Sequence, residues 1–321
     1  MSASGHLVKA ERADLPEEVT GTGSLRSLLA GTIDYAGLFP PAGLTMAQSV
    51  ANYTRYRGDA NAWALGRFVL PAARLGEFTA SVAPQPGAGP FRLSALIGAD
   101  AAGDLARVVQ FNELHPGTAI VDTLEFKAAS PESIREALRL AAGQFVTFHE
   151  FPLEQPAQPF LDVLAGARGS QTLCLGRAKI RTGGLTADAF PEPAALARFL
   201  VQCAAARVPF KATAGLHHPL RAAHRLTYEP AAPTGVMHGF INVFSAAALA
   251  RKGWDAESLT EVLAEQSPSA FRFEPYHACF RTHRLTAADL ENSRTEFLNS
   301  FGSCSFEEPI SDLQQLGWLL K

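Results

Sequence analysis

The chain has 321 residues, of which 47% are hydrophobic and 18% are charged, and its formal net charge is -3. This length suits one large α/β domain or two average ones. The small negative charge and the lack of a basic stripe with interleaved aromatics argue against nucleic-acid binding. Neither a signal-peptide pattern nor an apolar run of membrane-spanning length is present. We therefore expect a cytoplasmic globular protein without nucleic-acid or membrane partners.

The four cysteines are spaced too widely for a zinc knuckle or a disulfide framework. Cys174, Cys203, Cys279 and Cys304 form no C-x-x-C pair. We expect them to be reduced thiols, mostly buried.

Strand-like apolar runs recur along the chain, with segments of helical periodicity between them. The helical segments include 104–114, 130–143 and 192–208. Strand followed by helix, eight times, predicts a (β/α)8 TIM barrel, with a doubly wound open sheet as the alternative. The eight predicted strands are 31–39, 66–71, 91–98, 118–127, 144–151, 174–181, 208–215 and 238–244.

The predicted domain organisation has three parts. Residues 1–23 are expected to form an N-terminal arm, and residues 24–269 the barrel. Residues 270–321 exceed what a final barrel helix needs, so we expect a C-terminal extension that packs on the barrel and contains a helix over 286–299.

Polar residues fall on one side of several predicted strands, because side chains alternate between faces along a strand. The apolar set would face the helices, and the polar set would face the barrel interior near the carboxyl ends of the strands, where barrel enzymes have their active sites. Asp34, at the end of the first strand, could reach the same pocket. The polar set comprises Glu125, Lys127, His149, Lys179, Arg181, Lys211, Thr213, His238 and Asn242.

Two lysines in such a pocket indicate amine chemistry. Desolvation and a nearby like charge both lower the pKa of a lysine, and a neutral amine can attack a carbonyl to form a Schiff base. We predict Lys179, Lys211, Glu125 and His149 as catalytic residues, with no metal and no cofactor. Arg181 and Lys127 favour an anionic small-molecule substrate. The predicted substrate-binding residues are Arg181, Lys127, Asn242, His238, Thr213 and Asp34.

The lysine strands also carry a family resemblance. "AKIRTGG" followed by "FKATAGL" resembles the deoxyribose-phosphate aldolase-like class I aldolases, which are (β/α)8 barrels. The resemblance implies that Lys179 is the Schiff-base lysine, Lys211 its partner lysine and Asp122 the catalytic aspartate. Arg181 replaces a small polar residue of that pattern, and "GLHHPL" replaces a glycine-rich turn that helps to hold phosphate. A carboxylate or sugar-like substrate therefore fits at least as well as a phosphate.

The leading hypothesis is an aldolase-like lyase that forms a Schiff base with a small oxygenated carbonyl compound. One alternative is a metal-dependent hydrolase or lyase on the same barrel. Another is a non-catalytic barrel that binds a small anionic ligand, and homo-oligomer formation stays open in every case. The ligands of the metal alternative would be His149, His217, His218, His238 and Glu125.

Overall fold

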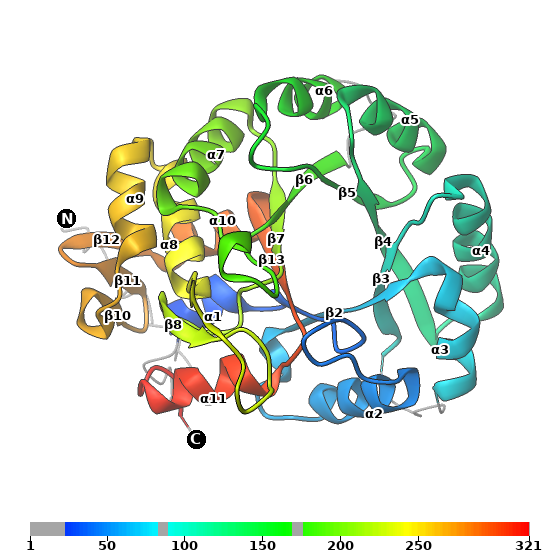
Figure 1. Cartoon of the computed structure of the whole chain (residues 1–321), viewed down its shortest axis with the longest axis horizontal. Helices are drawn as coiled ribbons and strands as arrows, with labels where there is room; N and C mark the ends of the chain where they lie inside the picture. Colours follow the sequence, from blue (N-terminus) through cyan, green and yellow to red (C-terminus); the bar gives the residue numbers. More distant parts are fainter. Residues whose placement is uncertain (1–22, 83–88, 169–175, 321) are drawn as a thin grey trace, which may run out of the picture.

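A closed eight-stranded barrel forms the centre of the molecule, and Figure 1 views it with helices arranged around it. The computed structural model describes residues 23–82, 89–168 and 176–320. Every barrel strand is parallel to both of its neighbours, which confirms the predicted (β/α)8 fold. In their order around the barrel the strands are β1 (Ile33–Tyr35), β2 (Leu65–Pro71), β3 (Phe91–Leu96), β4 (Ala119–Lys127), β5 (Val146–Glu150), β6 (Gly176–Arg181), β7 (Phe210–Thr213) and β13 (Leu298–Ser303).

Helices follow the strands and cover the outside of the barrel (Figure 1). Local sequence explains several of their boundaries. Thr45 and Ser130 form capping boxes at the start of α2 and α5, and Pro131 occupies the first turn of α5, where its missing N–H costs nothing. The helices are α1 (Gly23–Leu29), α2 (Met46–Arg57), α3 (Leu75–Ser81), α4 (Ala101–Leu114), α5 (Pro131–Ala141), α6 (Gln158–Arg168), α7 (Pro193–Ala206), α8 (Phe240–Arg251), α9 (Ala256–Ala264), α10 (Ala287–Glu296) and α11 (Glu307–Gln315).

The predicted eighth strand, 238–244, is wrong. Residues from Phe240 onward form helix α8, whose residues Phe240–Ala250 are all buried. This helix packs against α7, α9, α10 and β13. It is mostly apolar and buried on every side, so its sequence has no helical periodicity and resembles a buried strand.

The true eighth strand is β13, which pairs with β1 on one side and β7 on the other. The predicted barrel limit at residue 269 is therefore also wrong, because the C-terminal region closes the barrel. The same region adds a helix close to the predicted 286–299 and a small antiparallel sheet beside α1 and α10 (Figure 1). The added strands are β10 (Phe271–Phe273), β11 (His277–Phe280) and β12 (His283–Thr286), and a separate hairpin consists of β8 (Ala222–Arg225) and β9 (Thr234–Met237).

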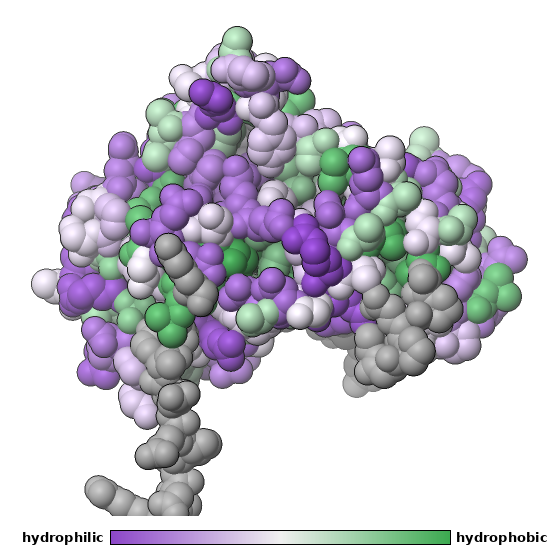
Figure 2. Space-filling model, turned by 90° about the horizontal axis from the view of Figure 1, so that it is seen from below, coloured by the Kyte–Doolittle hydropathy of each residue, from purple (hydrophilic) through white to green (hydrophobic). Residues whose placement is uncertain are grey.

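The main core lies between the barrel and its helices. Near β1 and β2 it contains packed aromatic rings, with Phe68 contacting Tyr35, Tyr53 and Phe78 at centroid distances of 5.9, 5.5 and 5.7 Å. The face shown in Figure 2 is mainly hydrophilic, with hydrophobic residues in small separate groups. The apolar side chains on these strands pack against the surrounding helices, and polar residues occupy the strand ends.

Other expectations concern parts of the chain outside the barrel. Apart from Gly23, the predicted N-terminal arm lies outside the described residues, as does Cys174. Cys203, Cys279 and Cys304 are buried free thiols, as expected. In the described part of the chain, no helix is both long enough and apolar enough to cross a membrane.

Candidate active site

A cavity of about 350 Å³ opens at the carboxyl ends of the barrel strands. Its wall includes residues at or just after the ends of β1, β3, β4, β5, β6, β7 and β13. This is the end of the barrel at which TIM-barrel enzymes carry out their chemistry. The charged residues that line it are Glu125, Lys127, Glu150, Lys179, Arg181 and Lys211.

The two lysines lie opposite each other on β6 and β7, as expected, where Lys179 and Lys211 are register partners. Both contact the same carboxylate from β4. Lys179 Nζ lies 2.8 Å from Glu125 Oε2, and Lys211 Nζ donates to Glu125 Oε1 at 2.8 Å. The two lysines and Glu125 therefore share one pocket, as predicted.

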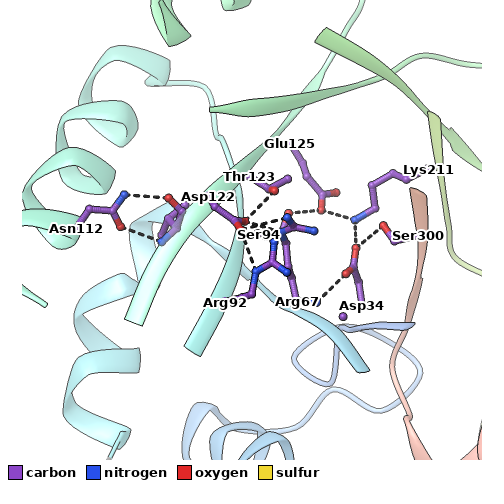
Figure 3. Close-up of polar contacts among 12 residues, drawn as sticks. Asp34, Arg67, Arg92, Ser94, Asn112, Asp122, Thr123, Glu125, Lys211 and Ser300 are labelled. Carbon is purple, nitrogen blue, oxygen red and sulfur yellow. Dashed lines mark hydrogen bonds and ion pairs between the residues drawn. The ribbon is translucent and has the colours of Figure 1, made fainter. Parts of the chain in front are cut away.

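A second carboxylate flanks each lysine. Lys211 Nζ also donates to Asp34 Oδ2 at 2.6 Å, and Lys179 Nζ lies 2.7 Å from Glu150 Oε2. The result is a continuous chain of alternating charges, which we call the charge chain: Asp34, Lys211, Glu125, Lys179 and Glu150. Figure 3 shows the part of it around Asp34, Lys211 and Glu125.

Hydroxyl groups and the backbone complete the buried end of the charge chain. Ser94 Oγ donates to Glu125 Oε1 at 2.6 Å, and Ser300 Oγ donates to Asp34 Oδ2 at 2.7 Å. The backbone N–H of Arg67 donates to Asp34 Oδ1 at 2.8 Å (Figure 3). These hydrogen bonds satisfy the oxygens of the buried carboxylates and so reduce the cost of burying them.

The ion pairs of the charge chain fix the charges of Lys211 and Glu125. Burial opposes the charge of Lys211, but Asp34 and Glu125 outweigh it and raise the pKa of the ammonium group. Burial likewise opposes the charge of Glu125, but Lys179 and Lys211 hold the pKa of this carboxyl far below its usual range. Lys211 is therefore a fixed cation and Glu125 a fixed anion. The expectation that burial and a nearby like charge lower the pKa of the lysines is wrong for Lys211, because the closest charges are the carboxylates of Asp34 and Glu125.

The glycines after each lysine strand allow two loops to touch. A Cβ on Gly183 would lie 2.9 Å from the Cα of Gly215, and Gly215 itself has φ +75°, which other residues rarely adopt. Thr182 Oγ1 donates to the carbonyl of Ala214 at 2.6 Å across the same contact. The glycines in "RTGG" and "TAGL" thus hold the rims of β6 and β7 together next to the cavity.

Two further cations stand at the mouth of the cavity. Arg181 and Lys127 line it, as expected, and both also line an adjoining cavity of about 810 Å³. Arg181 Nη1 lies 3.8 Å from Glu150 Oε1, and its side chain is 57% exposed. Lys127 forms no ion pair with any residue that the structure describes. Together they give the junction of the two cavities an excess of positive charge.

The predicted catalytic role of His149 is wrong, because β5 turns its other face to the cavity. Phe148 lies under Lys211, whose Nζ is 5.3 Å from the ring centroid, and Glu150 borders the cavity. His149 is fully buried on the opposite face, stacked on Phe126 and 3.0 Å from Thr147 Oγ1. Burial lowers its pKa to about 3. Glu150 was missed, although its alternation with Phe148 is visible in the sequence.

The predicted substrate contacts His238 and Asn242 are also wrong. Asn242 lies in α8, where its amide donates to the carbonyls of Val262 and Glu265 and its oxygen accepts from the Arg221 backbone N–H. His238 Nε2 is 2.7 Å from the carbonyl of Pro191. Neither residue lines the cavity. Both hold loops and helices around it, whereas Thr213 does line it and Asp34 stands directly behind Lys211.

Asp122, the aspartate implied by the resemblance, lies toward the other end of β4. It pairs with Arg67 and Arg92, as Figure 3 shows, and does not line the cavity. The carboxylate that β4 presents to the lysines is Glu125.

The predicted metal ligands do not come together. His149 lies on the face of β5 turned away from the cavity, His238 lies between β9 and α8 beside the carbonyl of Pro191, and His217 and His218 follow β7. In residues 23–82, 89–168 and 176–320, no group of three or more His, Cys, Asp or Glu side chains is arranged to hold a metal ion.

Comparison with protein-family models gives no match, and comparison with curated proteins gives no significant match. The case for a function therefore depends on the site itself.

Proposed function

We propose that this barrel is an aldolase-like lyase in which Lys179 forms a Schiff base with a small, anionic, oxygenated carbonyl compound. The observation that carries the proposal is the position of Lys179. Its amine lies in the cavity wall at the carboxyl ends of the strands, between the carboxylates of Glu125 and Glu150. A nucleophile with a proton acceptor within hydrogen-bond reach is the arrangement that covalent catalysis requires.

The charge chain supports Lys179 over Lys211 as the nucleophile. Lys211 is 1% exposed and its pKa is raised, so it stays protonated between Asp34 and Glu125. Lys179 is 5% exposed and lines the cavity. It has to lose one proton before it can attack a carbonyl carbon.

Glu150 is the proton acceptor that this proposal assigns. Glu125 is held as an anion by two lysines, which makes it a weak base. Glu150 contacts Lys179 at 2.7 Å, whereas its second cation, Arg181, is farther away at 3.8 Å. Glu150 also borders both cavities, so a proton taken from Lys179 can pass on to the substrate or to water. The amine then adds to the carbonyl, and the resulting hydroxyl leaves as water when it receives the proton, which gives the iminium. The iminium accepts the electron pair of the carbon–carbon bond that is broken.

The cations at the cavity mouth support an anionic substrate. Lys127 and Arg181 flank the cavity at the ends of β4 and β6, a few side chains away from Lys179. A guanidinium and an ammonium there can bind a carboxylate or a phosphate while the carbonyl reaches the lysine. A cavity of about 350 Å³ fits a small molecule.

Borohydride reduction tests the proposal. The protein is incubated with pyruvate, dihydroxyacetone phosphate or uncharged acetaldehyde, then reduced and mapped by peptide mass spectrometry. We expect an adduct on Lys179 with at least one anionic probe, no adduct in Lys179→Arg, and a retained adduct in Lys211→Arg, which keeps the buried cation. An adduct on Lys211 would reverse the assignment. No adduct with any probe would reject the Schiff base and favour a barrel that only binds ligands.

A further inference from the structure

His217, which follows β7, occupies a part of the cavity wall that the charge chain does not reach. It is 8% exposed and lines the same cavity as Lys179. Its neighbours come from the C-terminal segment. Nδ1 lies 3.3 Å from Ser303 Oγ, 3.6 Å from Glu308 Oε2 and 3.8 Å from Cys304 Sγ.

The hydroxyl of Ser303 determines which nitrogen of His217 carries the proton. Ser303 Oγ donates its only proton to the carbonyl of Ser305 at 2.6 Å. In its contact with His217 the same oxygen must therefore accept, so Nδ1 is protonated. The nearby Glu308 carboxylate favours the same tautomer. Nε2 then carries a lone pair, and this atom has no partner among the residues that the structure describes.

The surroundings keep this imidazole neutral at pH 7. Burial, together with the nearby His218 and His224, lowers the pKa of His217 to about 4. The adjacent His218 is arranged differently, since its Nδ1 lies 2.6 Å from Asp312 Oδ2 and its ring stacks on His224. Of the two neighbouring histidines, His217 is the one that lines the cavity.

We propose that His217 Nε2 is the base that moves a carbon-bound proton of the substrate once Lys179 holds it. The inference rests on the proposed function. Nε2 takes a proton from the carbon next to the iminium carbon, and the C–H electron pair becomes the C=C bond of an enamine. The C=N pair moves onto the Lys179 nitrogen and removes its positive charge. In the reverse step, the imidazolium returns the proton to the enamine carbon, so no further reactant is needed.

The division of roles follows from the charges. The carboxylates beside Lys179 are engaged with its ammonium group and with proton transfer at nitrogen. His217 stands beside β13, on the far side of β7 from Lys179, and is uncharged. A substrate bound through its carbonyl carbon to Lys179 would therefore place its remaining carbons between an ionic wall and a neutral base.

Proton exchange in D2O provides the test, with pyruvate and dihydroxyacetone phosphate as probes. Both compounds carry C–H bonds next to the carbonyl, and NMR follows the replacement of these protons by deuterium. In His217→Asn we expect the borohydride adduct on Lys179 to form as in the unmodified protein. We expect the rate of proton exchange to fall by about a hundredfold or more. His218→Asn is the matched control, and we expect its exchange rate to change no more than severalfold. His217→Gln serves as a second variant if the asparagine variant does not fold.

Each outcome distinguishes the two proposals. Adduct formation with exchange at the unmodified rate in His217→Asn would overturn the role of His217 and leave the Schiff base standing. Equal loss of exchange in His218→Asn would also overturn it, because the effect would then be structural. Absence of any adduct in the unmodified protein would reject the Schiff base and the role of His217 with it.

Discussion

Replacing Lys211 by methionine tests whether the charge chain is held together as described. Methionine is close to lysine in length, so Lys211→Met removes the charge with little change in packing. Two ion pairs disappear, at 2.6 Å to Asp34 and 2.8 Å to Glu125. Glu125 keeps Lys179 as a partner. Asp34, which is 1% exposed, keeps the hydrogen bonds from Ser300 and from the backbone N–H of Arg67.

The expected cost is that of one buried, unpaired carboxylate. Breaking a buried ion pair by removing one partner costs about 3–5 kcal/mol. Because Asp34 keeps two hydrogen bonds, we expect the lower end, about 3 kcal/mol. The measurement is urea unfolding at pH 7 followed by circular dichroism, with the midpoint lowered and the slope unchanged.

A second substitution makes the reasoning refutable. Asp34→Asn in the Lys211→Met background removes the stranded charge, so we expect the double variant to be more stable than the single variant by about 1 kcal/mol or more. A single variant within about 0.5 kcal/mol of the unmodified protein, or a double variant less stable than the single one, would show that the ion pair is not maintained in solution.

Two further predictions concern acid and the cavity mouth. The folded-state pKa of Glu125 lies below its unfolded value, so its charge stabilises the fold above about pH 5, and this contribution is lost as the pH falls toward the folded pKa. In urea unfolding, the stability difference between the unmodified protein and Glu125→Gln should shrink from pH 6 to pH 3, and a difference that grows would contradict the assignment. Arg181→Leu removes the cation that we expect to pair with the pyruvate carboxylate. The Arg181 side chain is exposed, and an exposed ion pair contributes about 1 kcal/mol, so the pyruvate concentration needed for half-maximal borohydride trapping should rise roughly fivefold. Acetaldehyde trapping should be unchanged, and an equal loss for both probes would argue against an anion contact.

The sequence predicted the barrel because seven of its eight strands are apolar runs with helical segments between them. It failed at the eighth strand for a physical reason. "LNSFGS", which forms β13, is rich in glycine and serine and has weak strand propensity. "FINVF", in α8, is apolar except for Asn242 and is buried among α7, α9, α10 and β13. Tertiary burial, which local propensity does not contain, decided both segments.

The candidate site shows the same division between local pattern and tertiary context. Alternation correctly placed Lys179, Lys211 and Thr213, because β6 and β7 carry polar residues on one face only. It also placed Glu125, which lies between the apolar Leu124 and Phe126 on β4. On β5 alternation pointed to His149, because Thr147 and His149 are polar and Val146 and Phe148 are apolar, yet the face of Phe148 and Glu150 is the one that meets the cavity. The contacts of His217 depend on residues near position 303, which no local pattern connects to it.

The position of β13 has a consequence for how the chain is made. Strands β1 and β7 are both synthesised long before Leu298–Ser303 leave the ribosome. Each of them pairs with β13, which lies between them in the barrel. Until then, the nascent sheet has two open parallel edges whose backbone groups lack partners and can pair with another chain. Ser300, which donates to Asp34, arrives with the same strand. A chain that stalls or is cut before Leu298 would therefore expose both edges and leave one hydrogen bond of Asp34 unmade, and such products should be prime substrates for chaperones and proteases.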